Sequence, residues 1–184
     1  MITNSRYRRR DFLASAGGLT AFSFLGISQA GEETSSAPAR RVVTGLNATG
    51  KSAIVSDGPV PATARYSKPG EESGSDLWLE KSVPVKNLDQ TDPMADYSMQ
   101  AGPPAGGVIV GTATWEPGHS YPMHRTDTID FLFVISGQIE LILEQGSTVL
   151  ESGDCLVQRG TNHAWRVVGD ESCTFAVVLL SAER

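Results

Sequence analysis

The chain has 184 residues and a formal net charge of −6 at pH 7, and its first thirty residues carry four arginines and one aspartate. The remainder therefore carries a charge of about −9, which argues against nucleic acids and anionic membrane surfaces as partners. Two cysteines are too few for a disulfide framework. The remaining length suits one ordinary domain with a well-buried core.

Residues 1–30 have the layout of a secretory signal. A basic start is followed by a moderately apolar run at 12–27 and by a small-residue end at Ala30. The run contains several Gly, Ser and Thr residues, so it is short and weakly hydrophobic for a bilayer that needs about twenty apolar residues. A permanent membrane anchor is therefore the less favoured interpretation.

The basic start also contains a specific motif. The placement of Arg9, Arg10, Phe12 and Leu13 resembles the twin-arginine export motif. The resemblance implies transport of the folded protein by the twin-arginine translocase, cleavage near Ala30 and a bacterial periplasmic location. An amphipathic basic helix lying on a membrane is the alternative, but it accounts only for the arginines.

The rest of the chain has the pattern of a β protein. Residues 31–40 lack large apolar side chains and are expected to form a disordered arm. Short β-branched stretches separated by turn residues then follow, and no amphipathic helix is evident. Strands are expected at 41–44, 52–55, 77–79, 108–115, 129–135, 139–143, 148–150, 155–157, 163–168 and 174–180.

The strand density divides this part of the chain in two. Residues 41–106 are expected to be loop-rich N-terminal strands that pack on a barrel, with long loops around one strand at 56–106. Residues 107–184 are expected to form the barrel core, with hairpin links at 136–138 and 145–147. No repeat of solenoid or propeller length is visible, so an all-β sandwich or a closed antiparallel jelly roll remains.

Polar residues at inward positions are the candidates for chemistry. Asp130 shares its alternation with Leu132 and Val134, so its carboxylate is expected to point into an apolar interior. A carboxylate there is costly unless it faces a cation, a metal or several hydrogen-bond donors. His124 lies six residues before Asp130, so a continuous extended chain would place both side chains on one face. His163 begins a later strand. His124 alone is more often a core or rim histidine, but the three together favour a metal site.

The spacing around these residues resembles the first motif of the cupin superfamily. That motif is Gly, five residues, His-x-His, three or four residues, Glu, six residues and Gly. Here the same spacings hold for Gly118, His124, Thr126, Asp130 and Gly137. Two positions depart from the motif, because the second histidine is Thr126 and the glutamate is Asp130.

A second cupin motif is matched less exactly. Gly153, Gln158, Gly160, His163 and Val167 stand where the family has Gly, Pro, Gly, His and Asn, with one residue fewer after the first glycine. The resemblance is close over 118–167 and extends by strand pattern over about 107–181. It also points to a subgroup of small bacterial and fungal cupins, most of which have no assigned reaction.

The resemblance implies a fold and a site. The fold is the cupin double-stranded β-helix, an antiparallel jelly-roll barrel. The site implied is one divalent metal ion held by His124, Asp130 and His163, and iron, manganese, zinc and nickel are all compatible with these ligands. Thr126 or His119 could complete the ligand shell, and Trp165 shares the parity of His163 and is expected to line the pocket.

Other polar side chains are expected to play no part in the site. Arg125 and Arg166 alternate with inward neighbours and should point outward, as solvated or dimer-contact residues. Cys155 and Cys173 are interpreted as buried small hydrophobes on neighbouring strands, with a single disulfide after export as the alternative.

Three functions remain open from the sequence. The leading hypothesis is an exported metal-dependent enzyme acting on a small carbonyl- or carboxylate-containing molecule, of dioxygenase, decarboxylase, isomerase or dehydratase type. The first alternative is a non-catalytic cupin that binds a small molecule in a reduced or empty metal site, which the missing second histidine favours. The second is a hydrogen-bond network that stabilises the barrel. Family resemblance also implies a homodimer formed through edge strands of residues 41–80.

Overall fold

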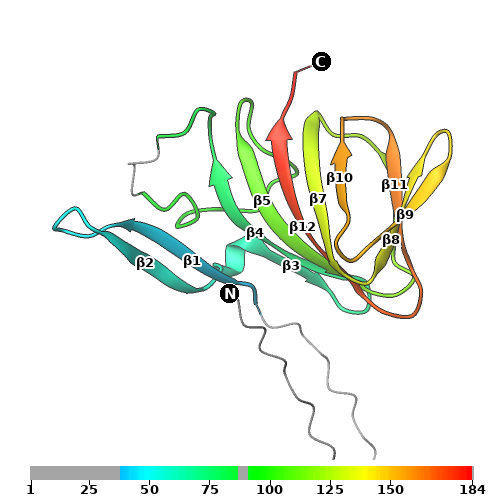
Figure 1. Cartoon of the computed structure of the whole chain (residues 1–184), viewed down its shortest axis with the longest axis horizontal. Helices are drawn as coiled ribbons and strands as arrows, with labels where there is room; N and C mark the ends of the chain where they lie inside the picture. Colours follow the sequence, from blue (N-terminus) through cyan, green and yellow to red (C-terminus); the bar gives the residue numbers. More distant parts are fainter. Residues whose placement is uncertain (1–37, 87–90, 184) are drawn as a thin grey trace, which may run out of the picture. The chain divides into compact units, whose positions relative to one another are not determined.

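Two antiparallel sheets face each other around a shared apolar core (Figure 1). The structure, a computed structural model, describes residues 38–86 and 91–183. The all-β, antiparallel prediction is confirmed, and the one helical element in these ranges is a single 3₁₀ turn at Ala62–Ala64. No helix in the described part of the chain is long and apolar enough to cross a membrane. The signal motif lies outside the described residues, as does most of the expected arm.

The larger sheet has six strands. In spatial order these are β10 (Cys155–Gln158), β7 (Thr128–Ser136), β12 (Cys173–Ser181), β5 (Val108–Trp115), β4 (Glu72–Glu80) and β3 (Arg65–Lys68). The smaller sheet has the order β6 (Ser120–His124), β11 (His163–Val168), β8 (Gln138–Leu143) and β9 (Ser147–Glu151). β1 (Arg40–Leu46) and β2 (Ser52–Pro59) form a separate two-stranded sheet.

Strict alternation along the strands builds the core between the two large sheets. In β5 every second residue is buried, and in β7 the buried set includes Asp130, Leu132 and Val134, as the alternation predicts. Because pleating sends successive side chains to opposite faces, each of these strands contributes one row to the core. The core cluster comprises Ala113, Trp115, Leu132, Val134, Ile139, Leu141, Leu150, Trp165, Val167, Cys173 and Phe175.

The two expected hairpin links have different outcomes. The link at 145–147 does join the paired strands β8 and β9. The link at 136–138 is not a hairpin, because β7 and β8 lie in different sheets and the chain crosses between them there. Gly137 makes this crossing at φ +74°, and a Cβ at this position would lie 2.3 Å from the carbonyl oxygen of Ser172. The positive φ and the close approach of the Ser172 carbonyl oxygen therefore require glycine at this corner.

The sequence pattern did not predict two of the observed strands. β3 and β6 were not expected. Because β3 lies within 56–106, the prediction of long loops around only one strand there was wrong. β6 contains a proline and is exposed at four of its five positions, so it shows no period-two alternation. β3 is short and lacks β-branched residues.

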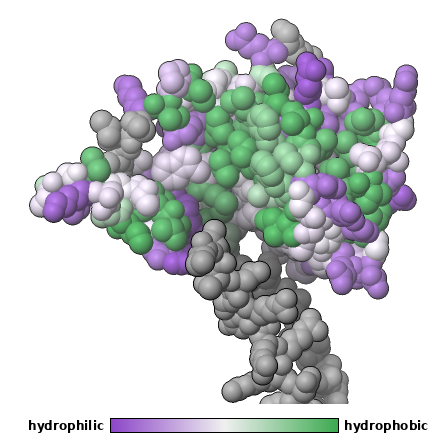
Figure 2. Space-filling view, in the orientation of Figure 1, coloured by the Kyte–Doolittle hydropathy of each residue, from purple (hydrophilic) through white to green (hydrophobic). Residues whose placement is uncertain are grey.

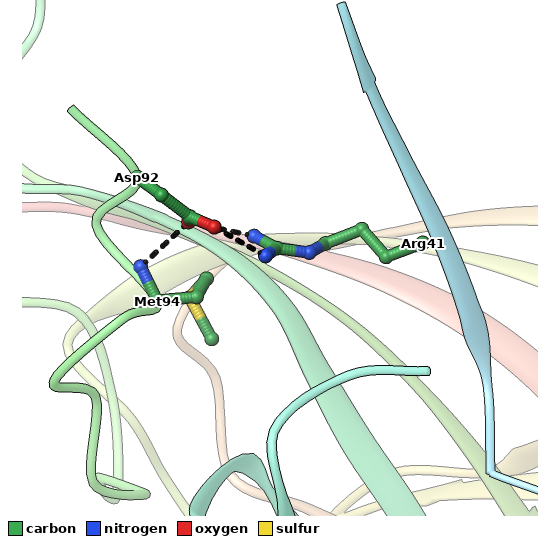
Figure 3. Close-up of polar contacts among 3 residues, drawn as sticks. All are labelled: Arg41, Asp92 and Met94. Atoms are coloured by element: carbon green, nitrogen blue, oxygen red, sulfur yellow. Dashed lines mark hydrogen bonds and ion pairs between the residues drawn. The ribbon is translucent and has the colours of Figure 1, made fainter. Parts of the chain in front are cut away.

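A partly buried ion pair holds the β1–β2 sheet to the loop that follows β4 (Figure 3). The Arg41 guanidinium donates two hydrogen bonds to the Asp92 carboxylate, and Asp92 Oδ1 also accepts the backbone N–H of Met94 at 3.0 Å. The Arg41 guanidinium lowers the pKa of the Asp92 carboxyl. Arg41 also lies over the ring of Trp78, 5.6 Å from its centroid. A two-stranded ribbon is marginally stable alone, so these contacts anchor it.

The two cysteines are free thiols in different surroundings. Cys173 is fully buried, as expected, whereas Cys155 is exposed, which corrects the expectation that both are buried. Their strands, β12 and β10, are separated by β7 and are not neighbours. Burial raises the pKa of the Cys173 thiol to about 11.

The corner at Gly137 yields a stability prediction. Gly137→Ala should lower the free energy of unfolding by about 3 kcal/mol, because it adds both a clash and backbone strain. Gly169→Ala is the matched control, since Gly169 also has a positive φ (+85°) but nothing lies within 4 Å of an added Cβ. Its loss should be about 1 kcal/mol. Urea denaturation measures both, and equal losses would contradict the close approach to Ser172.

The cysteines yield a reactivity prediction. In dilute native protein, iodoacetamide should alkylate Cys155 and leave Cys173 unmodified, because the thiolate is the nucleophile and Cys173 is both buried and protonated. Both should react after denaturation in guanidinium. Mass spectrometry of tryptic peptides reads the pattern, and a Cys155–Cys173 disulfide peptide from the native protein would contradict it.

Candidate functional site

A cavity of about 220 Å³ opens between the two large sheets. Its wall is mostly aromatic and aliphatic, with a few polar groups, which is the usual composition of a small-molecule site. The lining residues are Ala101, Trp115, Tyr121, His124, Thr126, Asp130, Leu132, Leu156, Gln158, His163, Trp165, Phe175, Val177 and Leu179.

The two histidines of this cavity come from paired strands. His124 ends β6 and His163 begins β11, and the two are register partners with ring centroids 4.2 Å apart. The expected continuous extended path from His124 to Asp130 is wrong, because residues 125–127 carry the chain from the smaller sheet to the larger one. His124 and Asp130 therefore reach the same cavity from opposite sheets.

Backbone carbonyls fix the orientation of both imidazoles. His124 Nδ1 lies 2.9 Å from the carbonyl oxygen of Pro122, and His163 Nδ1 lies 2.9 Å from that of Thr161. A carbonyl oxygen only accepts, so each Nδ1 carries the hydrogen and each Nε2 of a neutral ring keeps its lone pair. Burial lowers the pKa of His163, which favours its neutral form. This arrangement is typical of histidines that ligate metals through Nε2.

Asp130 is a buried carboxylate with an unsatisfied oxygen. It lies in the middle of β7 with an exposed fraction of 9%, and its Oδ1 has no hydrogen-bond partner. Burial raises the pKa of Asp130, and the Thr128 hydroxyl and the two histidines partly oppose this. Its register partner Gln158 does not satisfy it, because the Gln158 amide donates to Thr161 instead. An orphaned buried acceptor of this kind requires an explanation.

The chemistry of these three residues fits a divalent metal ion, although they do not form a finished site. Two Nε2 lone pairs and one unpartnered carboxylate oxygen are the donors that iron, manganese, zinc and nickel accept. Within 38–86 and 91–183, however, no group of three or more His, Cys, Asp or Glu side chains is placed so that it could hold a metal. A metal ion held by all three residues would therefore require their side chains to move from the positions described here.

The three additional candidate residues differ in whether they line the cavity. Thr126 lines the cavity, and its hydroxyl oxygen accepts the Thr128 hydroxyl at 2.8 Å. Trp165 is buried in the lining with its ring edge-on to His163 at 5.6 Å. His119 is not part of the lining; its Nε2 lies 3.7 Å from Glu72 Oε2. Of the additional residues considered, Thr126 and Trp165 thus share the cavity with the two histidines and Asp130.

Both arginines point away from the cavity, as expected. Arg166 is exposed and donates two hydrogen bonds to Glu140 on β8. Arg125 is exposed, and its Nη2 lies 4.0 Å from Asp127 Oδ1. Neither residue is among those that line the cavity.

Sequence reasoning missed a buried polar cluster next to the cavity. Glu72 is 8% exposed. Its Oε1 lies 2.8 Å from Lys68 Nζ, and its Oε2 lies 3.7 Å from His119 Nε2. Trp115 packs edge-on against His119 at 4.9 Å, and burial raises the pKa of nearby Tyr66 to about 12. The alternation of β5 could have placed Trp115, but nothing in the sequence indicated that Glu72 faces inward.

Comparisons with known proteins match the barrel part of the chain. Residues 111–179 match the family described as Cupin domain. Phomopsin biosynthesis cluster protein C′ of Diaporthe leptostromiformis is 41% identical over 88 residues, covering 45% of this chain and 47% of that protein. The cupin-domain-containing oxidoreductase virC of Hypocrea virens is 29% identical over 131 residues, covering 68% of this chain and 65% of that protein. The chain spans about half the length of the first of these relatives.

The solved structures are more distant. The cupin domain of Cnp3 from Schizosaccharomyces pombe has a TM-score of 0.47 and 10% identity, covering 77% of this chain and 87% of that one. Both curated relatives above are fungal proteins, so they give no support to the expected bacterial periplasmic location. The match to the family described as Cupin domain therefore covers residues 111–179, which lie within the antiparallel strands from β5 to β12.

Proposed function

We propose that the cavity binds one divalent metal through His124, Asp130 and His163, and that the protein is a metal-dependent enzyme acting on a small organic molecule. The observation that carries this proposal is the unsatisfied, buried Asp130 Oδ1 beside two histidines whose Nδ1 atoms are already occupied. The relatives named as oxidoreductases favour an oxidation or reduction as the reaction class.

The cavity wall favours a neutral substrate. Among its described lining residues none is lysine or arginine, so an anionic group would find no cationic partner other than a metal. Trp115, Trp165 and Phe175 offer aromatic faces and edges to an apolar body, while Thr126 and Gln158 supply hydrogen-bonding groups. A bound metal would polarise a substrate carbonyl or support redox chemistry. We therefore favour a carbonyl compound over a carboxylate.

A specific observation also favours the second candidate, a cupin that binds a small molecule without catalysis. The described residues contain no ready metal cluster, and Thr126 occupies the position of the motif's second histidine. A threonine hydroxyl is a weak metal ligand, and this one is already engaged with Thr128. In this alternative the same apolar wall would bind a ligand, and no metal would be needed.

Metal content distinguishes these candidates. The protein purified without chelator or nickel affinity should contain about one equivalent of iron, manganese, zinc or nickel per chain, and His124→Ala/His163→Ala should contain almost none. Elemental mass spectrometry measures this, and circular dichroism verifies that the double variant is folded.

His119→Ala is the matched control for this experiment. It also removes an imidazole, but from a residue that faces Glu72 and not the cavity. It should keep the metal of the unmodified protein. Absence of metal from the unmodified protein, even after reconstitution, would leave the binding candidate, and equal loss in His119→Ala would reject the ligand assignment.

We also propose that residues 1–30 direct export through the twin-arginine translocase, on the motif at Arg9, Arg10, Phe12 and Leu13. In a bacterium that has this translocase, Arg9→Lys/Arg10→Lys should leave uncleaved precursor in the cytoplasm. Arg6→Lys/Arg8→Lys keeps the same charge outside the pair and should be exported normally. Immunoblotting of cell fractions measures both, and equal export of the two variants would contradict the motif.

A further inference from the structure

A second pocket lies on the face of the larger sheet that is opposite the cavity. Its volume is about 390 Å³, which falls within the usual range of small-molecule sites. Strands β3, β4 and β5 form its floor, and residues just before β1 and in the 3₁₀ turn complete its wall. The lining residues are Pro38, Ala39, Ala62, Arg65, Tyr66, Ser67, Ser73, Gly74, Ser75, Thr112, Ala113 and Thr114.

Two rows of polar side chains cross the floor of this pocket. In the register of the sheet, Arg65 pairs with Ser75, and Ser75 pairs with Thr112. The second row is formed in the same way by Ser67, Ser73 and Thr114. On β5 these positions alternate with Ala113 and Trp115, which belong to the core, so their side chains point to the outside of the barrel. Paired positions lie about 5 Å apart, so one ligand can contact both rows.

Away from this pocket, the outward face of the same sheet is apolar. Phe131, Phe133 and Val157 are register partners or neighbours on β7 and β10, and Phe133 and Val157 are 46% and 51% exposed. Figure 2 shows hydrophobic residues gathered where Figure 1 places β5, β12 and β7. The two rows of hydroxyl side chains thus mark a local change in the chemistry of this face.

Two polar groups of the pocket have no partner among the described residues. Ser75 is 7% exposed, and its hydroxyl forms no hydrogen bond within 38–86 and 91–183. The Arg65 guanidinium beside it is exposed and forms no ion pair or hydrogen bond within the same ranges. The Thr112 hydroxyl, by contrast, donates to the carbonyl oxygen of Phe175 at 3.0 Å. A buried hydroxyl without a partner next to an unpaired guanidinium indicates a position for a ligand.

The charges around the pocket favour an anion. Among its described lining residues Arg65 alone is charged, and none is aspartate or glutamate, although the chain carries a net charge of −6. A guanidinium presents its N–H donors in a planar fork that matches the oxygens of a carboxylate or a phosphate. The Ser75 hydroxyl can donate to the same oxygens.

We propose that this pocket binds a small hydroxylated organic anion, whose carboxylate or phosphate group lies between Arg65 and Ser75. The other hydroxyl side chains of the two rows hydrogen-bond the ligand's own hydroxyl groups, since serine and threonine both donate and accept. A volume of about 390 Å³ equals that of about 13 water molecules, which suits a six-carbon sugar acid or sugar phosphate. The site is independent of the proposed metal, because it shares no lining residue with the cavity.

Nuclear magnetic resonance titration of the isotope-labelled protein with three probes tests the proposal. Gluconate carries a carboxylate, glucose 6-phosphate carries a phosphate, and glucose carries neither. At least one anion should shift the backbone amide resonances of Ser75 and Thr112, with a dissociation constant of about 1 mM. Glucose should bind at least about 10-fold more weakly. The anion that binds more tightly distinguishes a carboxylate from a phosphate as the recognised group.

Two pocket variants and one control assign the binding to these side chains. Arg65→Gln and Ser75→Ala should each weaken binding of the anion at least about 10-fold, because each removes a donor to a charged group. Arg125→Gln is the matched control, since it also removes an exposed arginine, but one outside the pocket. It should leave binding unchanged. Circular dichroism verifies that all three variants are folded.

Several results would overturn the proposal. One is that neither anion binds at about 10 mM, and another is that glucose binds as tightly as the anions. A third is that Arg65→Gln leaves binding intact, or that Arg125→Gln weakens it equally. The proposal also fails if the resonances that shift belong to cavity residues such as Trp165 and not to Ser75 and Thr112.

Discussion

Pleating of strand β7, which lies between β10 and β12, is the constraint on which the rest of this structure depends. It sends Asp130, Leu132 and Val134 inward and the residues between them outward, so a one-residue slip would place a row of large apolar side chains against the cavity and expose the core row. The register is held from both sides, by β10 and β12. Because the cavity lies on the inward face, its carboxylate is fixed by the same hydrogen bonds that build the sheet. The cost of burying Asp130 is thus an obligatory consequence of the fold once aspartate occupies this position.

The sequence predicted those elements whose stability comes from burying one face. Alternation located β5 and β11 at their observed bounds and placed Asp130 inside, because side chains on a half-buried strand must follow period two. It failed where other interactions decide the path. β6 is exposed at most positions, and its place beside β11 depends on pairing with a distant strand, which no local pattern encodes. The corner at Gly137 looked like a hairpin because glycine with positive φ serves both hairpins and crossings between sheets.

The same distinction applies to the candidate site. The motif spacing identified the two histidines and the carboxylate as candidates. The inferred reason for the proximity of His124 to Asp130, one continuous extended strand, was wrong, since the two residues approach from opposite sheets. His119 could not be assigned from the sequence, because its surroundings are set by Glu72 on β4, far away in the chain. The carbonyl partners of His124 and His163 were equally invisible, as backbone acceptors leave no trace in residue identity. A hydrogen bond from Nδ1 to a carbonyl oxygen decides that Nε2 is the ring nitrogen available to a metal or ligand.

The two faces of the larger sheet differ in chemistry. The inward face of β7, β10 and β12 carries Asp130 and Gln158 in a mostly apolar wall, whereas the outward positions of these strands carry no charged residue. Because successive residues of one strand serve opposite faces, Val157 lies directly between Leu156 and Gln158, which both line the cavity.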